Sequence, residues 1–374
     1  MKIRGAILTT IGAEKPYARS RPLEIGELEL DPPGRNEVLV RLHAAGLCHS
    51  DLSVIDGNRP RPVPMLLGHE AAGVVLEIGQ GVDDLAVGDH VVAVFVPSCR
   101  SCAPCVTGRP ALCEPAFASN SAGTLLHGDR RLHAAGKPVN HHLGVSAFAS
   151  HAVLARESLV RIDKDLPLEQ AALFGCAVIT GVGAVINTAA LPEGARVAVI
   201  GLGGVGLAAL LGARLRNPRQ LLAVDFAGPK LDLARKLGAT ATIDVSASEA
   251  LEQLRQLTDG GVDFAFEMAG AVAALDFAWR ATRRGGTTVT AGLNHPDARL
   301  SLSPLTLVAE ERTLKGSYLG SCDPARDVPR YVDWFRQGRL PVDALMGETL
   351  GLEDLNGAFD RLASGQMLRQ VVVL

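Results

Sequence analysis

The sequence lacks the features that nucleic-acid-binding and membrane proteins usually have. It contains no long run of lysine or arginine and has a formal net charge of −3 at pH 7, whereas a polyanionic partner normally selects a basic stripe. No segment approaches the ~20 continuous apolar residues that span a bilayer. The opening MKIRGAILTT has no apolar stretch followed by a small-residue cleavage site. We therefore expect no nucleic-acid partner, no membrane partner and a cytoplasmic location.

Internal repeats and low-complexity linkers are also missing from the sequence. The chain of 374 residues is 47% hydrophobic and 21% charged, which is typical of a globular protein with a large interior. A single hydrophobic core rarely serves so long a chain, so we expect about two domains.

The first half of the chain consists of short apolar segments separated by turn signals. Examples are EVLVRLHAAG at 37–46, AAGVVLEIG at 71–79 and DHVVAVFVP at 89–97. Clusters of glycine and proline, such as DPPG at 31–34, lie between such segments. This pattern predicts a β-rich, barrel-like domain.

From about residue 178 onward, strand and helix patterns alternate. The expected strands are RVAVIGL at 196–202, QLLAVD at 220–225, VDFAFEMAG at 262–270 and TTVTAGL at 287–293. Helical patterns follow the first two strands, and Ser246 and Glu249 have the spacing of a capping box for a third helix. This alternation predicts a parallel sheet with helices on both faces.

Four of the seven cysteines lie close together, with the spacing Cys99-x2-Cys102-x2-Cys105-x7-Cys113. Four thiolates at such short intervals can enclose Zn²⁺ in a tetrahedral shell that leaves no position for a substrate. The alternative, four reduced cysteines in a loop, is much rarer in a chain without an export signal. The spacing therefore predicts a structural zinc site.

A second, dispersed set of residues could form a catalytic metal site. Cys48, His69 and Cys176 stand in the segments GLCHSD, GHE and GC. A catalytic zinc needs three protein ligands and one open position, and these three residues would meet that need. Taken singly, each is more often a buried cysteine or a hydrogen-bonded core histidine. Their spacing in the sequence does not show that they converge.

The motif GLGGVG follows a predicted strand and opens a predicted helix. Its glycines are Gly201, Gly203, Gly204 and Gly206, and Asp225 ends the next strand. Such glycines let the backbone approach a pyrophosphate at the helix N-terminus, while the acid accepts hydrogen bonds from the ribose. The acid would repel a 2′-phosphate, and the following FAG contains no arginine to bind one. We therefore expect NAD rather than NADP.

Together, and in this order, these motifs resemble those of the zinc-containing medium-chain alcohol dehydrogenases. The similarity continues through GKPVNHHLGVSAFASHAVL to the ending GQMLRQVVVL. It is greatest to the liver-type and glutathione-dependent formaldehyde dehydrogenase branches, which share the long loop after the cysteine lobe. The resemblance implies an α/β protein with a GroES-like, β-rich barrel catalytic domain at 1–177 and 321–374. A doubly wound Rossmann domain with a parallel sheet would bind NAD at 178–320.

The resemblance also implies roles for the residues around the metal. Cys48, His69 and Cys176 would bind the catalytic zinc, and Glu70 would lie behind the metal as an exchangeable ligand. Asp51 would orient His69, as carboxylates behind ligating imidazoles commonly do. With the four-cysteine site, the chain would hold two zinc ions.

Further matches concern the reaction and the cofactor. Ser50 matches the hydroxyl residue that hydrogen-bonds the alcohol and passes its proton outward, while hydride moves to NAD. The residues that match cofactor-contacting positions are His49, Thr180, Val205, Lys230 and Arg369.

Several positions depart from the family pattern. Ser53 stands where liver enzymes usually carry a relay histidine. Phe117 and Arg59 replace an arginine and an acidic residue of the glutathione-dependent branch, which argues against glutathione-linked formaldehyde oxidation. His142 stands where an aromatic pocket residue commonly precedes Leu-Gly.

By resemblance, the substrate pocket is formed by Phe95, His142, Leu293 and Tyr318, with Arg59 near its mouth. His142 and Tyr318 can form hydrogen bonds, and a buried polar group without a partner costs about 1–3 kcal/mol. We therefore expect aryl or polar-substituted primary alcohols and aldehydes as substrates. An alternative role for His142 is to replace the missing relay histidine.

The resemblance leaves related activities open. One alternative is a nicotinoprotein with a permanently bound cofactor, and another is a thiol-dependent formaldehyde-type dehydrogenase. A non-enzymatic alternative is a zinc-stabilised nucleotide-binding protein, but no catalytic ligand is lost. Zinc-free quinone reductases lack both cysteine sets. Because liver-type relatives with this long loop are usually dimers, we expect a homodimer.

Overall fold

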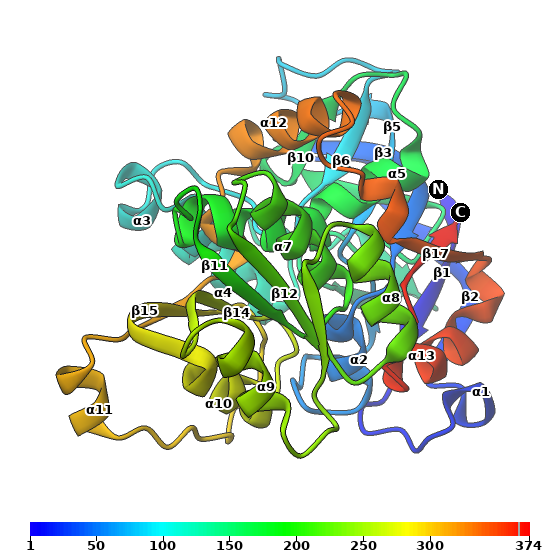
Figure 1. Cartoon of the computed structure of the whole chain (residues 1–374). Helices are drawn as coiled ribbons and strands as arrows, with labels where there is room; N and C mark the ends of the chain where they lie inside the picture. The colour runs from blue at the N-terminus through cyan, green and yellow to red at the C-terminus, as the bar shows by residue number, and fades with distance from the viewer. Residues whose placement is uncertain (366) are drawn as a thin grey trace. The chain divides into compact units, whose positions relative to one another are not determined.

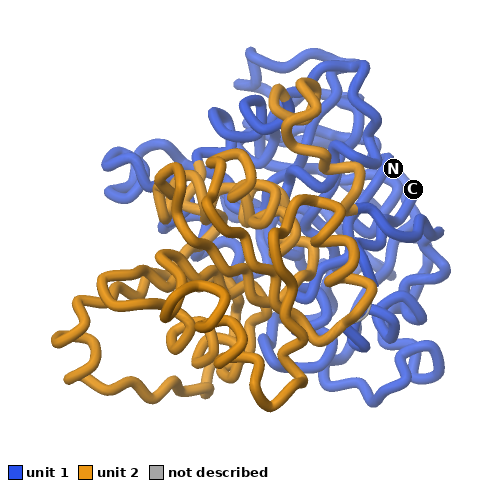
Figure 2. The backbone as a smooth tube through the Cα atoms, in the orientation of Figure 1, with its two compact units in different colours: residues 1–176, 323–332, 346–374 blue, residues 177–322, 333–345 orange. Residues whose placement is uncertain are grey.

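The computed structural model describes residues 1–365 and 367–374, which divide into two compact units. Unit 1 consists of Met1–Cys176, Asp323–Val332 and Met346–Leu374, and unit 2 of Ala177–Cys322 and Asp333–Leu345 (Figure 2). The chain therefore leaves unit 1 after Cys176 and returns to it twice.

Unit 1 is mainly built from strands (Figure 1). Its strands are β1 (Lys2–Leu8), β2 (Leu23–Leu30), β3 (Glu37–Gly46), β4 (Met65–Leu66), β5 (Ala71–Ile78), β6 (His90–Ala93), β7 (Leu132–Ala134), β8 (Lys137–His141), β9 (His151–Ala155), β10 (Leu159–Ile162), β17 (Met346–Leu350) and β18 (Arg369–Val373). Strands β1-β2-β7-β8-β4 form a closed barrel. A second sheet has the order β10-β6-β5-β3-β18-β17, with β9 paired to β3. The C-terminal strand β18 thus lies against β3, the strand that leads to Cys48.

Short helices connect these strands. They are α1 (Tyr17–Ser20), α2 (His49–Ile55), α3 (Ala103–Val106), α4 (Glu114–Ala122), α5 (Leu168–Ala172) and α13 (Leu355–Ala363). The helix α12 (Pro324–Arg336) begins in unit 1 and ends in unit 2. The barrel is filled by apolar residues that alternate along its strands, among them Ile3, Leu28 and Leu132.

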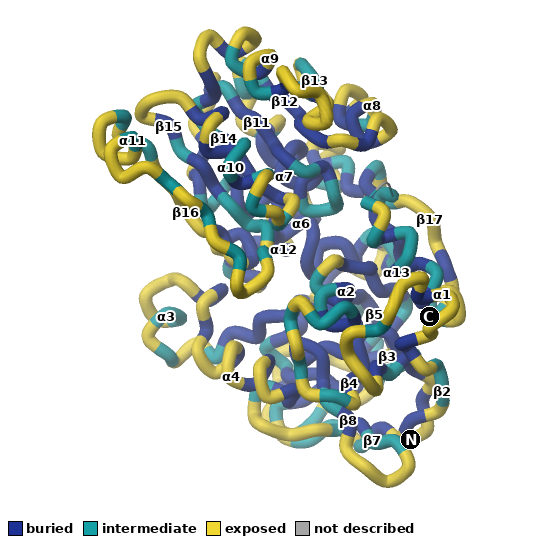
Figure 3. Tube along the Cα trace, turned by 90° about the horizontal axis from the view of Figure 1, so that it is seen from below, coloured by how far each residue is buried: buried dark blue, intermediate teal, exposed yellow. Residues whose placement is uncertain are grey.

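Unit 2 alternates strands and helices. Its strands are β11 (Arg196–Ile200), β12 (Gln220–Asp225), β13 (Ala241–Asp244), β14 (Val262–Glu267), β15 (Thr282–Thr290) and β16 (Thr313–Gly316). Its helices are α6 (Ala177–Gly183), α7 (Gly204–Arg214), α8 (Gly228–Lys236), α9 (Ala250–Leu257), α10 (Val272–Ala281) and α11 (Pro304–Ala309). Strand burial is high in the centre of the sheet, whereas α11 is largely exposed (Figure 3).

All strands of this sheet are parallel, in the order β13-β12-β11-β14-β15-β16. This order reverses direction between β11 and β14, as in a doubly wound dinucleotide-binding sheet. Helices α9 and α10 contact each other, and so do α6 and α7, as expected for two separate helical layers. The prediction of a doubly wound parallel sheet is confirmed.

One predicted strand is shorter than expected, and one predicted helix start was wrong. The segment 89–97 forms a strand only at β6, His90–Ala93. The capping box from Ser246 to Glu249 is also absent, because α9 begins later and Glu249 precedes it without a side-chain cap. Asp244 instead accepts hydrogen bonds from Ser246 N and Oγ, at 2.9 and 2.5 Å, and holds this segment in a turn.

Among the described residues, no single helix is long and apolar enough to cross a membrane. One bent pair, Leu168–Gly175 and Ala177–Thr188, passes the same test by length and composition. Most of its side chains are buried in the protein.

Candidate active site and metal centres

The segment GLCHSD forms the junction between β3 and α2. Cys48 directly precedes α2, and its backbone N–H donates to Asp51 Oδ2 over 3.2 Å. Asp51 lies in the first turn of the helix, so its carboxylate reaches back to the start of α2. This hydrogen bond fixes the two residues relative to each other, and both side chains are buried.

Gly68 determines how His69 enters the site. Its φ is +91°, in the left-handed region that glycine adopts without strain. A Cβ at this position would lie 2.7 Å from the backbone nitrogen of Phe148. The turn at Gly68 therefore brings His69 and Glu70 into the interior between β4 and β5, where both are buried.

The structure brings together the three residues expected to bind the catalytic metal. The ligand atoms of Cys48, His69 and Cys176 all lie within 4.8 Å of one another, and all three residues are buried. Cys176 Sγ is 3.5 Å from His69 Nε2. Residues separated by more than a hundred positions thus form one cluster inside unit 1.

Asp51 orients the imidazole of His69. Its Oδ1 accepts from His69 Nδ1 at 3.0 Å and from Gly68 N at 3.1 Å. Because the carboxylate can only accept, an imidazole that binds a metal here would carry its proton on Nδ1. Nε2, which faces the sulfur of Cys176, would then offer its lone pair to the metal.

The electrostatics of this cluster favour a cation at His69 Nε2. Burial opposes the charge of Asp51, but the neighbouring imidazoles of His69 and His142 hold its pKa at about 2. Burial would lower the pKa of His69, yet the charges of Asp51 and Cys48 raise it to about 10. The pKa of Cys48 is lowered by a hydrogen bond from Cys176, which favours the thiolate that binds metals.

Glu70 and Arg369 form a buried ion pair beside the cluster. Arg369 Nε donates to Glu70 Oε1 at 3.1 Å, and its Nη2 donates to Oε2. Burial raises the pKa of Glu70 against the effect of Arg369. A Cβ on Gly46 would lie 2.0 Å from Glu70 Oε1, so the glycine provides the space for this carboxylate.

These residues fit a zinc ion by chemistry and by charge. Two thiolates and one neutral imidazole are a known ligand set for catalytic zinc and leave a fourth position open. Two buried thiolates would be costly without a compensating charge, and a dication supplies it. The adjacent ion pair is already neutral as a whole.

The four-cysteine lobe also fits zinc. The ligand atoms of Cys99, Cys102, Cys105 and Cys113 lie within 4.8 Å of one another. Two of the sulfur–sulfur distances are 4.0 Å, close to the ~3.8 Å expected around tetrahedral zinc with Zn–S bonds of about 2.3 Å. Cys99 N and Cys102 N each donate to a sulfur at 3.3 Å. With four thiolates, this arrangement has no open position.

The loop GLGGVG has the geometry of a pyrophosphate-binding turn. Gly201 has a φ of +88° and its Cβ position lies 2.7 Å from Ala269. A Cβ on Gly206 would lie 1.8 Å from Gly201 O, so this glycine permits close packing of α7 on β11. At Gly203 nothing lies within 4 Å of the Cβ position, so the backbone is accessible to a ligand.

Asp225 lies at the carboxyl end of β12, as expected, and holds the neighbouring loops. Its Oδ2 accepts from Leu202 N at 2.6 Å, and its Oδ1 from Phe226 N and Ala227 N. The nearby Lys230 is buried, and burial lowers its pKa against the effect of Asp225. Asp225 therefore supports the glycine loop in addition to any contact with a ribose.

The remaining predicted residues fall into two groups. Phe95 and His142 are buried in unit 1 and place their rings 5.5 and 5.4 Å from that of His69. Of the other residues in unit 1, Ser50 and Arg59 are half-buried and His49 is exposed. Thr180 lies in unit 2 and is buried. The other predicted site residues of unit 2 are Gly204, Val205, Leu293 and Tyr318.

Two features of the site were not predicted from the sequence. One is Gly46, which had no evident role until Glu70 was found against it. The other is Glu267, a fully buried carboxylate at the end of β14. Its Oε1 accepts from Ala269 N and Gly270 N at 2.8 and 2.6 Å. A carboxylate directly followed by a glycine-containing turn, as in FEMAG, is the signal that could have revealed it.

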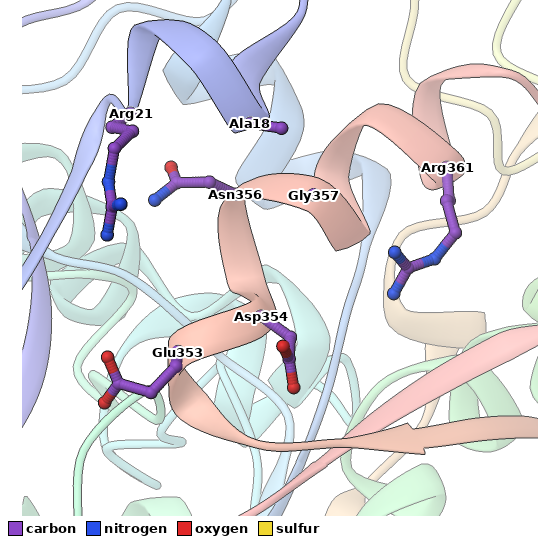
Figure 4. Close-up of a pocket in the computed structure, with 7 residues that line it drawn as sticks. All are labelled: Ala18, Arg21, Glu353, Asp354, Asn356, Gly357 and Arg361. Carbon is purple, nitrogen blue, oxygen red and sulfur yellow. The ribbon is translucent and has the colours of Figure 1, made fainter.

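A shallow polar pocket lies elsewhere in unit 1, between α1 and α13 (Figure 4). It is lined by Ala18, Arg21, Glu353, Asp354, Asn356, Gly357 and Arg361. Two of its charged side chains already form ion pairs, Glu353 with Arg4 at 2.5 Å and Arg361 with Glu348 at 3.3 Å. The pocket therefore does not resemble a prepared ligand site.

Comparison with known proteins agrees with this geometry. The family described as alcohol dehydrogenase GroES-like domain matches residues 34–164, and the family described as zinc-binding dehydrogenase matches residues 204–337. The S-(hydroxymethyl)glutathione dehydrogenase of Paracoccus denitrificans is 35% identical over the full length of both chains.

Two solved structures are similar over 100% of this chain and 99% of their own. One is an alcohol dehydrogenase zinc-binding domain protein from Burkholderia ambifaria, with a TM-score of 0.93 and 35% identity. The other is the benzyl alcohol dehydrogenase of Acinetobacter calcoaceticus, with a TM-score of 0.92 and 32% identity.

The fold and the two cysteine-containing clusters define a zinc-binding dehydrogenase. The chain belongs to the medium-chain alcohol dehydrogenase family. The predicted GroES-like and Rossmann fold and the enzyme class, an NAD-dependent zinc oxidoreductase, are confirmed.

Proposed function

We propose that this enzyme transfers hydride between NAD and a small primary alcohol or aldehyde that carries an aryl or polar group. The observation that carries the proposal is the convergence of Cys48, His69 and Cys176, with Asp51 orienting the imidazole. Unit 1 would be the catalytic domain and unit 2 the NAD-binding domain.

Cys48, His69 and Cys176 would hold the catalytic zinc, and Glu70 would serve as an exchangeable ligand. A zinc ion held there would supply a Lewis acid that favours loss of the alcohol proton, and bound NAD would supply the hydride acceptor. The lobe cysteines would hold the structural zinc. Arg369 keeps Glu70 paired, so that an unpaired carboxylate is not buried beside the thiolates.

Ser50 is the proposed first acceptor of the alcohol proton. It is half-buried in the first turn of α2, next to the exposed His49. Ser53 stands in the position of the relay histidine, but its hydroxyl donates its proton to His49 O at 2.8 Å and does not take over that role. Passage of the proton to solvent would therefore begin at Ser50.

For the cofactor, we propose a pyrophosphate site at Gly201–Gly206 and a ribose site at Asp225. The open backbone at Gly203 and the carboxylate at the end of β12 support this assignment. NAD is preferred to NADP because a buried carboxylate repels a 2′-phosphate. Thr180, Val205, Lys230, His49 and Arg369 are the further proposed contacts.

The proposed substrate-contacting residues are Phe95, His142 and Arg59 of unit 1 and Leu293 and Tyr318 of unit 2. The similarity to a benzyl alcohol dehydrogenase supports an aryl substrate. The second candidate is S-(hydroxymethyl)glutathione, because a similar protein is named for that activity. Against it, the Phe117 side chain is 73% exposed where that branch carries an arginine.

A substrate panel tests these candidates. Reduction of NAD would be followed with benzyl alcohol, ethanol, and formaldehyde plus glutathione. We expect the highest kcat/KM with benzyl alcohol. A higher kcat/KM with the glutathione adduct would favour the second candidate, and no reduction of NAD with any alcohol would contradict the proposal.

We also propose a homodimer and a cytoplasmic location. All four residues of β16, at one edge of the sheet of unit 2, are exposed. The neighbouring α11 carries Leu305 and Val308, which are 76% and 75% exposed. An uncovered sheet edge beside exposed apolar side chains is suited to pairing with a second copy.

A further inference from the structure

His142 directly follows β8 and lies against the residues that hold His69. It is 1% exposed, and its backbone N–H donates to Ser146 Oγ at 3.1 Å. Its ring is nearly perpendicular to that of His69, at 89°, with a centroid distance of 5.4 Å. A buried polar ring in this position requires a partner.

His142 Nδ1 lies 3.1 Å from Asp51 Oδ1. This oxygen already accepts from His69 Nδ1 and Gly68 N. The two acceptor directions of the oxygen are thus occupied, which explains why Nδ1 of His142 forms no well-aligned hydrogen bond within the described residues. Because it faces a carboxylate, Nδ1 nevertheless carries the proton.

A second metal ion does not explain this arrangement. Asp51, His69 and His142 do form a compact group of possible ligands. Their N···O distances of 3.0 and 3.1 Å are those of hydrogen bonds, whereas a tetrahedral metal would separate its ligands by about 3.3 Å. Gly68 N also donates into the same space.

His142 is also not needed to place Asp51. The carboxylate is already held by three donors, Cys48 N, Gly68 N and His69 Nδ1, at 3.0–3.2 Å. The remaining effect of His142 is electrostatic, because its N–H dipole lies close to a buried negative charge, where interactions are strong.

We propose that His142 is a positioning residue that divides the negative charge of Asp51 between two imidazoles and thereby weakens the hydrogen bond from His69. His69 is then a less electron-rich ligand, since a stronger bond to a carboxylate raises the basicity of a ligating imidazole. A less electron-donating His69 leaves the metal a stronger Lewis acid. This inference rests on the proposed catalytic zinc site.

The test uses the zinc-loaded enzyme with 15N-labelled histidine. The measured quantities are the 1H chemical shift of His69 Nδ1–H, the zinc content and kcat/KM. His142→Phe removes the N–H but retains a ring of similar size. His142→Asn keeps an N–H donor near the Nδ1 position. His141→Phe is the matched control, because His141 is equally buried but contacts Arg131 N and Ser146 instead of Asp51.

In His142→Phe we expect the His69 N–H resonance to move downfield and kcat/KM to fall about tenfold, with zinc content unchanged. His142→Asn should restore both values towards those of the wild type, and His141→Phe should leave the resonance in place. Should His142→Phe not fold, His142→Gln removes the donor from the Nδ1 position with a polar side chain.

An unmoved resonance in His142→Phe, or in His142→Gln, overturns the inference. Loss of zinc from the variant also overturns it, because His142 would then be needed to hold the site together. If the wild type itself lacks this zinc or does not reduce NAD with any alcohol, the proposed function fails instead.

Discussion

At the scale of single residues, Asp51 connects the parts of the proposed zinc site. It accepts from His69 Nδ1, from Gly68 N and from Cys48 N. Two of these three residues supply proposed metal ligands, and the third sets the turn before His69. Although Asp51 is not itself a proposed metal ligand, replacing its carboxylate should therefore disturb the proposed metal site.

We expect Asp51→Asn to weaken zinc binding about 10- to 100-fold, because an amide stabilises the Nδ1–H of His69 much less than a carboxylate does. Zinc release would be measured by competition with a chelator. Asp56→Asn is the matched control, since Asp56 lies at the end of the same helix, where its carboxylate accepts from Asn58 N and Nδ2 instead of from the proposed zinc site. Equal zinc affinity of both variants would contradict the role of Asp51.

A second residue-scale prediction concerns Asp225. We expect Asp225→Ser to reduce the preference for NAD over NADP, because it removes the charge that repels a 2′-phosphate. It should also lower the free energy of unfolding by about 1–3 kcal/mol, since backbone N–H groups of Leu202, Phe226 and Ala227 lose acceptors. The kcat/KM ratio for the two cofactors is the measurement. An unchanged ratio would rule out a role for Asp225 in cofactor choice.

The sequence predicts residues whose role is local better than residues whose role depends on tertiary contacts. Gly201, Gly203 and Gly206 were identified because turn geometry is encoded over a few residues. The partner of His142, in contrast, is 91 positions away in the sequence, and only the fold brings it to Asp51.

At the scale of elements, the short helix α1 depends on α13 for its stability. Asp360 in α13 accepts from Tyr17 N at 2.7 Å and from Ala18 N at 2.8 Å, and so caps the start of α1. The Tyr17 side chain is fully buried, and its hydroxyl has no hydrogen-bond partner within the described chain. This burial, with the charges of Asp56 and Asp360, raises the pKa of Tyr17.

We expect Tyr17→Phe to raise the free energy of unfolding at pH 7, by about 1 kcal/mol, because it removes a buried hydroxyl without a partner. The native protein keeps the Tyr17 proton to a higher pH than the unfolded chain does. Unfolding therefore releases a proton above about pH 10, and stability decreases as pH rises. The difference between the two proteins should widen there, as measured by urea unfolding. A variant less stable than the wild type at pH 7 and pH 10.5 would contradict this account.

Elements with strong periodicity were predicted well, and elements that depend on competing local hydrogen bonds were not. Strand β12 coincides with the predicted segment 220–225. A nearly continuous apolar run is typical of a strand that is buried on both faces of a parallel sheet. The start of α9 was wrong because Asp244, rather than Glu249, engages Ser246.

At the scale of the whole molecule, the exposed edge of unit 2 predicts self-association. We expect the double variant Leu305→Asp and Val308→Asp to be monomeric where the wild type is dimeric, because buried charges oppose an apolar interface. Light scattering after size-exclusion chromatography gives the mass directly. Val106→Asp is the matched control, since Val106 is 66% exposed in the cysteine lobe of unit 1. A wild type that is monomeric would disprove the dimer.

The central claim is that two cysteine-containing clusters hold two zinc ions with different roles. The most direct test is zinc content per chain together with NAD reduction by benzyl alcohol in the wild type, Cys48→Ala and Cys102→Ala. We predict two zinc ions and turnover in the wild type, and one zinc ion without turnover in a folded Cys48→Ala. Cys102→Ala should also lose one zinc ion, but mainly at the expense of stability, with residual turnover. Active wild-type protein with a single zinc ion, or full turnover in Cys48→Ala, would contradict the account.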